Sequence, residues 1–382
     1  MTFTTKRLIL RPWEERDAEE LYRYAKDPRI GYDAGWPPHT SVENSLDVIK
    51  KVLIGPERYA IVLKSTGLPI GSIALYFHND LARSDDEAEL GFWLGVPYWG
   101  QGIIPEASRE LMRHAFEDLR LSRIFCGYYD GNEKSKRVQE KLGFKYQRTI
   151  EDFPVHQLNE TRRAVVNVMP KKDWFDFCGI RNVVLYIHGK GGSASEAGFY
   201  KPLFSNFKIL GLDYKTFTPW ETGKEITDAV DGLKTCFDSV TIIANSIGAY
   251  FCMNADVSEK IERAFFISPV VNMEKLIKNM LLWANSTEEE LKEKGIIHTD
   301  FGEDLSWEYL SYVRERPIKW DVPTEILYGE RDDLTSFDTI TEFSQKINAH
   351  LTVMKGGEHW FHTKKQMKYL EKWIEKVQKV KQ

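Results

Sequence analysis

The chain has 382 residues, a net charge of −5 and 42% hydrophobic residues. This length is too great for one ordinary domain and suits two domains with sizeable cores. The mildly acidic balance argues against nucleic acid as a default partner. No apolar run is long enough to span a bilayer, and the N-terminus does not have the pattern of a signal peptide. We therefore expect a cytoplasmic protein with no membrane partner.

The cysteines and histidines indicate neither a disulfide framework nor a metal site. The four cysteines are scattered and form no Cys-x-x-Cys pair, which is typical of reduced thiols. His359 and His362 are three positions apart, but no further ligand cluster joins them. We expect no bound metal.

The first half of the chain has the pattern of an α+β domain, which we place at residues 1–174. Thr40 and Glu43 have capping-box spacing, so the second helix is expected to begin at Thr40. The stretch 170–179 is expected to be a connector to the second half. Helices are predicted at 18–25, 40–53, 107–116 and 134–141, and strands of a mostly antiparallel sheet at 6–11, 59–63, 70–76, 90–94, 123–129, 144–148 and 163–169.

A glycine-rich turn lies between the predicted strand at 90–94 and the helix that includes residues 107–116. Gly100 and Gly102 keep side chains away and let the backbone approach a ligand closely. The free N–H groups at the start of the helix would then face the ligand, and the helix dipole favours an anion. This order of elements is typical of a pyrophosphate site, although a glycine turn alone more often only closes a loop.

Three stretches of the first half resemble the GNAT acetyltransferases, in particular the branch that acetylates ribosomal-protein N-termini. They are residues 5–12 (TKRLILRP) with Asp17-Ala18, residues 99–102 (WGQG) with Glu106-Ala107, and Asn132-x-x-Ser135 followed by residues 140–144 (EKLGF). The resemblance implies that acetyl-CoA is the co-substrate, and that the acceptor is an amine of a protein N-terminus or of a small molecule. It also implies an acceptor groove lined by the loop 36–39. The residues expected to bind acetyl-CoA are Trp99, Gly100, Gln101, Gly102, Ile103, Ile104, Asn132 and Ser135.

Acetyl transfer from a thioester needs a neutral amine, a polarised carbonyl and a protonated leaving thiolate. Glu89 begins the strand that leads to the glycine turn and is the candidate base, directly or through a water; it could equally be a solvated carboxylate at a strand edge. Asn132 and Ser135 could bond the CoA arm or the departing sulfur, or be a helix cap and its first-turn serine. Replacing Glu89 by Gln is expected to lower turnover mainly on the acidic side.

The second half, residues 181–382, has the pattern of a doubly wound α/β domain with a parallel sheet. A charged, amphipathic insert at about 272–316 is expected to form a cap over the carboxyl edge of the sheet. Apolar strands are predicted at 182–187, 207–212, 239–243, 263–267, 324–328 and 350–354, separated by helices at 196–205, 224–237, 247–255, 337–347 and 363–380.

Three residues of this half follow strands in the order Ser, Asp, His. Ser246 lies at a strand-to-helix junction, Asp332 is favoured over Asp333 by its spacing from Gly329, and His359 follows the last strand, with His362 as a weaker rival. This order resembles that of the α/β-hydrolase superfamily, in a short form. The resemblance implies a catalytic Ser246–His359–Asp332 triad, with the N–H groups of Lys190 and Ile247 as the oxyanion hole.

Each of these residues also has a structural interpretation. Ser246 could cap a helix, Asp332 and Asp333 could form a turn, and His359 could be a buried, hydrogen-bonded histidine. Together they favour a bifunctional enzyme: an acetyl-CoA-dependent N-acetyltransferase fused to a serine hydrolase of the ester, thioester or amide class. The alternative is that one half is catalytic and the other is a pseudoenzyme that binds a ligand or partner.

Overall fold

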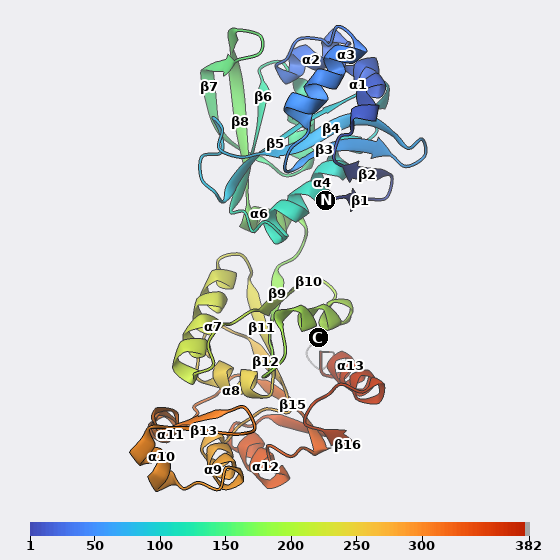
Figure 1. The fold of residues 1–382 in the computed structure, drawn as a ribbon. Helices are drawn as coiled ribbons and strands as arrows, with labels where there is room; N and C mark the ends of the chain where they lie inside the picture. Colours follow the sequence, from blue (N-terminus) through green and yellow to red (C-terminus); the bar gives the residue numbers. More distant parts are fainter. Residues whose placement is uncertain (379–382) are drawn as a thin grey trace. The chain divides into compact units, whose positions relative to one another are not determined.

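The structure is a computed structural model that describes residues 1–378. The chain divides into two compact units, Met1–Phe177 and Cys178–Gln382 (Figure 1). No helix among the described residues is both long and apolar enough to cross a membrane.

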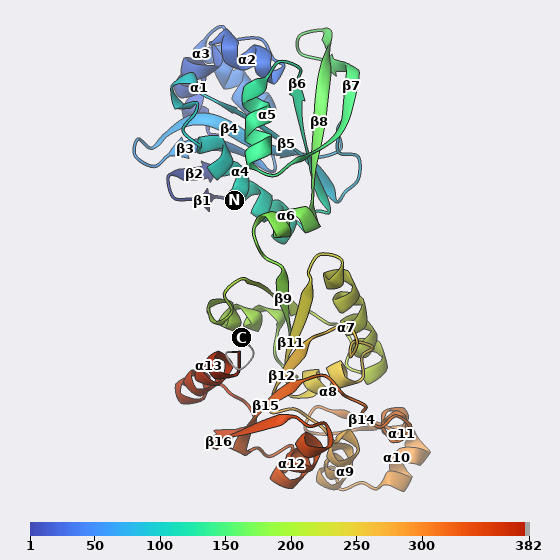
Figure 2. The ribbon, with the colours of Figure 1, turned by 180° about the vertical axis from the view of Figure 1, so that it is seen from behind.

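The first unit contains one sheet of eight strands in the order β1-β2-β3-β4-β5-β6-β8-β7. Its neighbours pair antiparallel, except that β5 and β6 are parallel and joined through α4. Figure 2 shows α5 beside α4. The strands are β1 (Phe3–Thr4), β2 (Leu8–Arg11), β3 (Arg58–Leu63), β4 (Leu68–Tyr76), β5 (Glu87–Leu94), β6 (Arg123–Tyr129), β7 (Lys145–Val155) and β8 (Glu160–Pro170), and the α-helices are α1 (Ala18–Ala25), α2 (Pro28–Ala34), α3 (Val42–Val48), α4 (Ile103–Glu117), α5 (Glu133–Lys141) and α6 (Lys171–Phe177).

Two local expectations for this unit are wrong, and one further helix is not predicted. The helix expected from Thr40 is capped by Ser41, whose side chain accepts a hydrogen bond from the Asn44 N–H at 3.1 Å. Pro28 begins α2, a helix that the sequence analysis does not predict, because proline suits the first turn of a helix and Asp27 caps it. The expected connector is largely the helix α6, and its Trp174 is buried and stacks on Phe116.

The parallel strands β5 and β6 pair only at their beginnings. Glu87, Ala88 and Glu89 oppose residues 123–125, and the two strands then continue to Leu94 and Tyr129 without further pairing. On its other side β5 stays paired with β4 along residues 89–94. The strands therefore open beyond Glu89, and the backbone groups of β5 that face this opening have no partner strand.

The second unit contains six parallel strands in the order β10-β9-β11-β12-β15-β16, as the alternating pattern of the sequence predicts. The direction of winding reverses between β9 and β11, and ligands of open parallel sheets bind at such a point, beyond the carboxyl ends of the strands. The strands are β9 (Asn182–Ile187), β10 (Phe207–Leu212), β11 (Ser239–Asn245), β12 (Arg263–Ile267), β15 (Thr324–Arg331) and β16 (His350–Glu358), and the α-helices of the sheet are α7 (Pro219–Lys234), α8 (Ile247–Met253), α12 (Phe337–Lys346) and α13 (Lys364–Gln378).

The helix expected at 196–205 is a 3₁₀ segment, Ala194–Leu203. Positions 379–380 of the expected last helix lie outside the described residues. The insert folds as α9 (Met273–Trp283), α10 (Glu288–Lys294), a hairpin of β13 (Ile296–His298) and β14 (Asp304–Ser306), and α11 (Trp307–Glu315). An ion pair between Lys190 and Glu303 connects the hairpin to the loop after β9. The insert therefore contacts the carboxyl end of the sheet.

Two glycines of the second unit should respond in opposite ways to replacement by alanine. A Cβ at Gly248 would lie 2.3 Å from the His188 carbonyl oxygen, so Gly248→Ala should force α8 away from β9 and destabilise the unit by about 1–3 kcal/mol. A Cβ at Gly232, in α7, would meet nothing within 4 Å, so Gly232→Ala should stabilise the unit by about 0.5–1 kcal/mol. Scanning calorimetry of the two variants measures both effects. Equal stabilities would contradict the close approach of α8 to β9.

Candidate active sites

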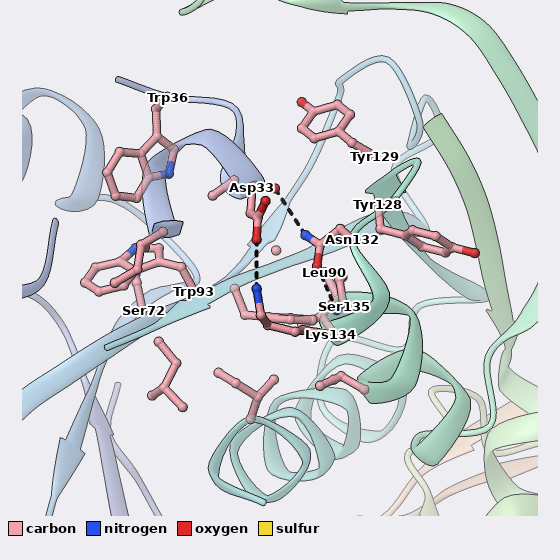
Figure 3. A pocket seen from close by; sticks show the side chains of 18 of the residues that line it. Asp33, Trp36, Ser72, Leu90, Trp93, Tyr128, Tyr129, Asn132, Lys134 and Ser135 are labelled. Atoms are coloured by element: carbon pink, nitrogen blue, oxygen red, sulfur yellow. Dashed lines mark hydrogen bonds and ion pairs between the residues drawn. The ribbon is translucent and has the colours of Figure 1, made fainter. Parts of the chain in front are cut away.

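The first candidate site is a cavity of about 880 Å³ beside the point where β5 and β6 separate (Figure 3). Among the segments that line it are β5 from Glu89 onward, the glycine turn before α4, the first turn of α5, and the loop 36–39. These are the segments in which sequence analysis placed the candidate base, the acetyl-CoA loop, the later signature and the acceptor groove. The fold brings all four to one cavity.

The glycine turn presents backbone, rather than side chains, to this cavity. Gly100 and Gly102 have φ angles of 75° and 74°, and a Cβ at Gly100 would meet nothing within 4 Å. Ile103 and Ile104 begin α4 and their side chains are buried in the core. Their N–H groups lie in the first helical turn, where no intrahelical acceptor is available. Such a turn fits the pyrophosphate of a nucleotide cofactor.

The side chains of Trp99 and Gln101 shape the loop. The Trp99 Nε1 donates to the Leu94 carbonyl at 2.8 Å, and the Gln101 Nε2 donates to the Pro97 carbonyl at 2.8 Å. Arg7 donates from Nη1 to the Gln101 carbonyl at 3.0 Å and from Nε to the Glu106 carboxylate at 2.7 Å. The first and second sequence signatures are therefore in contact, and together they hold the turn in place.

Asn132 caps α5 in this structure. Its Oδ1 accepts from the Ser135 N–H at 3.1 Å and its Nδ2 donates to the Asp33 carbonyl at 3.3 Å, while the Ser135 hydroxyl accepts from Gln139 at 3.2 Å. The helix-cap interpretation thus describes these contacts. Both residues nevertheless line the cavity, as does Leu90 of β5; all three are labelled in Figure 3.

Lys134 joins three parts of the cavity wall. Its ammonium lies 3.2 Å from the Asp33 carboxylate of α2 (Figure 3). It also lies 4.3 Å from the centre of the Trp99 ring. A cation over an indole face is attracted by the ring electrons. These contacts connect α2, α5 and the glycine turn around the cavity.

Glu89 is not a solvated edge carboxylate. Its Oε2 accepts a hydrogen bond from the Asn79 amide at 2.6 Å, and its residue lines the cavity. Burial raises the pKa of Glu89 to about 7, the Asn79 hydrogen bond opposes that rise, and the nearby Asp80 adds to it. A carboxyl group with this pKa can accept a proton near neutral pH.

The backbone of β5 beyond Glu89 also faces the opening. The Cys126 thiol donates to the Leu90 carbonyl at 3.2 Å, which places that carbonyl on the β6 side. The direction of backbone groups alternates along a strand, so the N–H and C=O of Phe92 point to the same side as those of Leu90. The backbone groups of Phe92 are therefore available to an extended ligand arm.

The loop 36–39, which we expected to line an acceptor groove, contributes to an aromatic wall. The Trp36 and Trp93 rings lie 6.0 Å apart in an edge-to-face arrangement, and Figure 3 shows both away from Asn132 and Lys134. His39 bonds the Ser45 hydroxyl through Nδ1 at 2.8 Å, and burial lowers the pKa of His39. An apolar wall of this kind excludes water from a bound ligand.

The second candidate site is centred on Ser246, between β11 and α8. Its φ of 50° and ψ of −121° lie in a region that side-chain-bearing residues rarely adopt, as in a sharp strand-to-helix elbow. The Ser246 hydroxyl lies 2.7 Å from the His359 Nε2. The Ser246 N–H donates to the Ile267 carbonyl at 3.0 Å, so the neighbouring strand β12 helps to hold the elbow.

Asp332 completes a chain of hydrogen bonds. Its Oδ2 lies 2.7 Å from the His359 Nδ1, and its Oδ1 accepts from the N–H groups of Leu334 and Thr335, both at 2.9 Å. The Asp332 side chain is fully buried, whereas Asp333 is exposed. His362 bonds the Trp360 carbonyl instead. The structure thus brings Ser246, His359 and Asp332 together and leaves both sequence rivals out.

The two residues proposed as oxyanion donors, Lys190 and Ile247, belong to segments next to the elbow. The Ile247 N–H opens α8, where it has no intrahelical acceptor. Lys190 follows Gly189, at which a Cβ would lie 3.2 Å from the Ser246 Cβ. The loop after β9 therefore passes directly beside the serine.

Sequence reasoning missed Asn79 and Asp33. Asn79 lies in the loop between β4 and β5, which contains no recognisable motif. The one sequence signal for Asn79 is that asparagine often begins a turn. Asp33 lies in α2, which the sequence analysis does not predict because a proline, Pro28, stands at its start.

Comparison with known proteins finds a domain family, curated relatives and solved structures that are similar to this chain. Residues 7–145 match the acetyltransferase (GNAT) domain family. An uncharacterised N-acetyltransferase of Bacillus licheniformis is 31% identical over 157 residues, which cover 40% of this chain and 86% of that protein. The "Putative ribosomal N-acetyltransferase YdaF" of Bacillus subtilis is 34% identical over 147 residues, 36% of this chain and 77% of that protein. The solved structure of ferulic-acid-bound Est1E from Butyrivibrio proteoclasticus is 16% identical, covers 52% of this chain and 88% of that chain, and has a TM-score of 0.44.

Gly102→Glu should weaken acetyl-CoA binding about tenfold or more, because it places a negative side chain at the helix N-terminus where a pyrophosphate would lie. Isothermal titration with acetyl-CoA measures the change. The matched control is Gly67→Glu in the β3–β4 turn. Gly67 has a φ of 70° and nothing within 4 Å of its Cβ position, so the backbone penalty is similar but the cavity is untouched. Equal weakening in the two folded variants would remove the turn from the binding site.

Proposed function

The chain belongs to the GNAT acetyltransferase family, and we propose that its first unit transfers the acetyl group of acetyl-CoA to the amino group of a protein N-terminus. The observation that carries this proposal is the single cavity that joins a glycine turn at a helix N-terminus to a buried carboxylate, at the opening between β5 and β6. The first would bind the pyrophosphate, and the second would deprotonate the amine.

The reaction needs the following steps. Glu89 accepts one proton from the acceptor's ammonium group, directly or through a water. The amine nitrogen then attacks the thioester carbonyl carbon, whose oxygen is polarised by a backbone N–H of β5 such as that of Phe92. The C–S bond breaks, and the thiolate takes the second proton that the nitrogen loses. The products are an acetamide and free CoA.

Two classes of amine fit this scheme. The name of the Bacillus subtilis relative refers to ribosomal acetylation, which supports a protein N-terminus as the acceptor. A small-molecule amine is the second candidate. Incubation with acetyl-CoA and synthetic N-terminal peptides of ribosomal proteins, read by mass spectrometry, tests the first class; small amines acetylated in place of peptides would favour the second.

Glu89→Gln should lower kcat/KM most near and just above pH 7. Glu89 acts as a base only when ionised, so with a pKa of about 7 its contribution is lost as pH falls through 7. This reverses the expectation of a loss mainly on the acidic side, which holds for a carboxylate with an ordinary pKa. An α-amine with a pKa of about 8 deprotonates by itself at higher pH, so the difference should shrink there.

The pH profiles of thiol release by the two proteins measure this difference, and acetyl-CoA titration serves as the control because binding should be retained. A variant profile that coincides with that of the wild type would mean that Glu89 is not the base.

We further propose that the second unit is a serine hydrolase for an ester, thioester or amide. The observation in support is the continuous Ser246–His359–Asp332 hydrogen-bond chain, with 2.7 Å at both links. Ser246 would attack the carbonyl carbon while His359 takes its proton at Nε2 and passes it to the leaving group. A water then releases the acyl group from Ser246 by the same route. The rival interpretation is a pseudoenzyme unit that only binds a ligand or partner.

Ser246 should be labelled by a fluorophosphonate probe, and His359→Ala should abolish both labelling and hydrolysis of activated esters. Asp332→Asn should lower kcat by a factor on the order of 10²–10⁴, because the imidazole loses its orienting carboxylate. The controls are His362→Ala and Asp333→Asn, which alter the exposed neighbours and should leave activity near that of the wild type. Labelling assays and ester kinetics give these values. A folded protein that the probe does not label would favour the pseudoenzyme interpretation.

A further inference from the structure

Asn79 connects a surface loop to the candidate base of the first unit. It lies between β4 and β5 and donates from Nδ2 to the Glu89 Oε2 at 2.6 Å. The loop is anchored by Leu81 and Ala82, which are buried in a small core with Phe125 of β6. The loop that carries Asn79 is therefore held in place beside the opening between the strands.

The backbone determines which end of the Asn79 amide faces Glu89. The Oδ1 accepts two backbone hydrogen bonds, from the N–H groups of Leu81 at 3.0 Å and of Ala82 at 2.8 Å. The Asn79 N–H in turn donates to the Ala82 carbonyl at 2.9 Å, which closes the turn. Because only an oxygen can accept those two hydrogen bonds, the amide nitrogen has to point toward the carboxylate. With the amide flipped, its N–H groups would face the N–H groups of Leu81 and Ala82, and its oxygen would face the Glu89 carboxylate.

We infer that Asn79 is a positioning residue: its amide orients the Glu89 carboxylate toward the cavity and stabilises its charged form. The inference rests on the acetyl-transfer function proposed above. A donor of fixed direction supports the ionised carboxylate at a buried position, where charge is otherwise unfavourable. It also occupies one carboxylate oxygen and leaves the other for the proton of the incoming amine.

The other groups around Glu89 do not supply this stabilisation. Asp80 of the same loop is negative and raises the pKa of Glu89. Tyr76 of β4 and Cys126 and Tyr129 of β6 interact electrostatically with Glu89, and burial is the first cause that raises the pKa of each of the three, so they face it in neutral form. The Asn79 amide is the group that the structure shows donating to the carboxylate.

The test uses two neighbouring substitutions in the full chain with opposite expected effects. Asn79→Asp keeps the oxygen that binds the loop backbone but turns the donor into a second carboxylate, so the pKa of Glu89 should rise. The acidic limb of the pH profile of kcat/KM should then move to higher pH by about one unit or more. Asp80→Asn removes a negative charge from the same loop and should move the limb downward. The pKa of the Glu89 carboxyl, followed by carbon-13 NMR and assigned with Glu89→Gln, gives the same shifts without reference to turnover.

The outcomes separate this inference from the proposed function. If Glu89→Gln leaves the wild-type pH profile unchanged, the assignment of the base fails. If Glu89→Gln removes the acidic limb but Asn79→Asp lowers the rate equally at all pH values, Asn79 is only structural and the inference is overturned. Should Asn79→Asp not fold, Asn79→Ala carries the same test with a smaller upward shift, because it removes the donor without adding charge.

Discussion

The separation of β5 from β6 is the constraint on which the first unit depends. Two parallel strands normally continue their ladder, because an unpaired backbone group in the interior is costly. Here the ladder ends at Glu89 and Phe125, and the glycine turn and α5 lie around the opening. An extended ligand arm can take the place of the missing strand and satisfy the backbone of β5. The opening also explains why Glu89 matters: it is the last paired residue, buried enough for its pKa to reach about 7, yet on the cavity wall.

The second unit depends on a different constraint, the shared edge of a parallel sheet. All six strands run in one direction, so the loops after β9, β11, β15 and β16 emerge on one side. Ser246, Asp332 and His359 are far apart in sequence but follow three of these strands. Gly189 and Gly248 lack side chains where the β9 loop approaches the serine elbow, which keeps the nucleophile and the neighbouring N–H groups close together.

The sequence predicts the parts of this protein that depend on pattern and order. The GNAT resemblance of the first half is confirmed by its relatives, and the helix predicted over residues 107–116 lies within α4, where Ala107, Leu111 and Phe116 are buried. Contacts that depend on tertiary structure could not be predicted. The sequence leaves open that Glu89 is a solvated carboxylate at a strand edge, because nothing in the sequence indicates that the β4–β5 loop covers it. Asn79 acquires its role only because Leu81 and Ala82 are buried, a condition set by β6.

The central claim is that the first unit performs acetyl transfer to an amine. The most direct measurement mixes the intact protein with acetyl-CoA and a panel of N-terminal peptides and small amines, and follows free thiol together with the mass of the acceptor. The account predicts thiol release that requires an amine and is matched, one for one, by an acceptor heavier by one acetyl group. Acetyl-CoA binding without amine-dependent release for any acceptor, under conditions where the protein is folded, would contradict it.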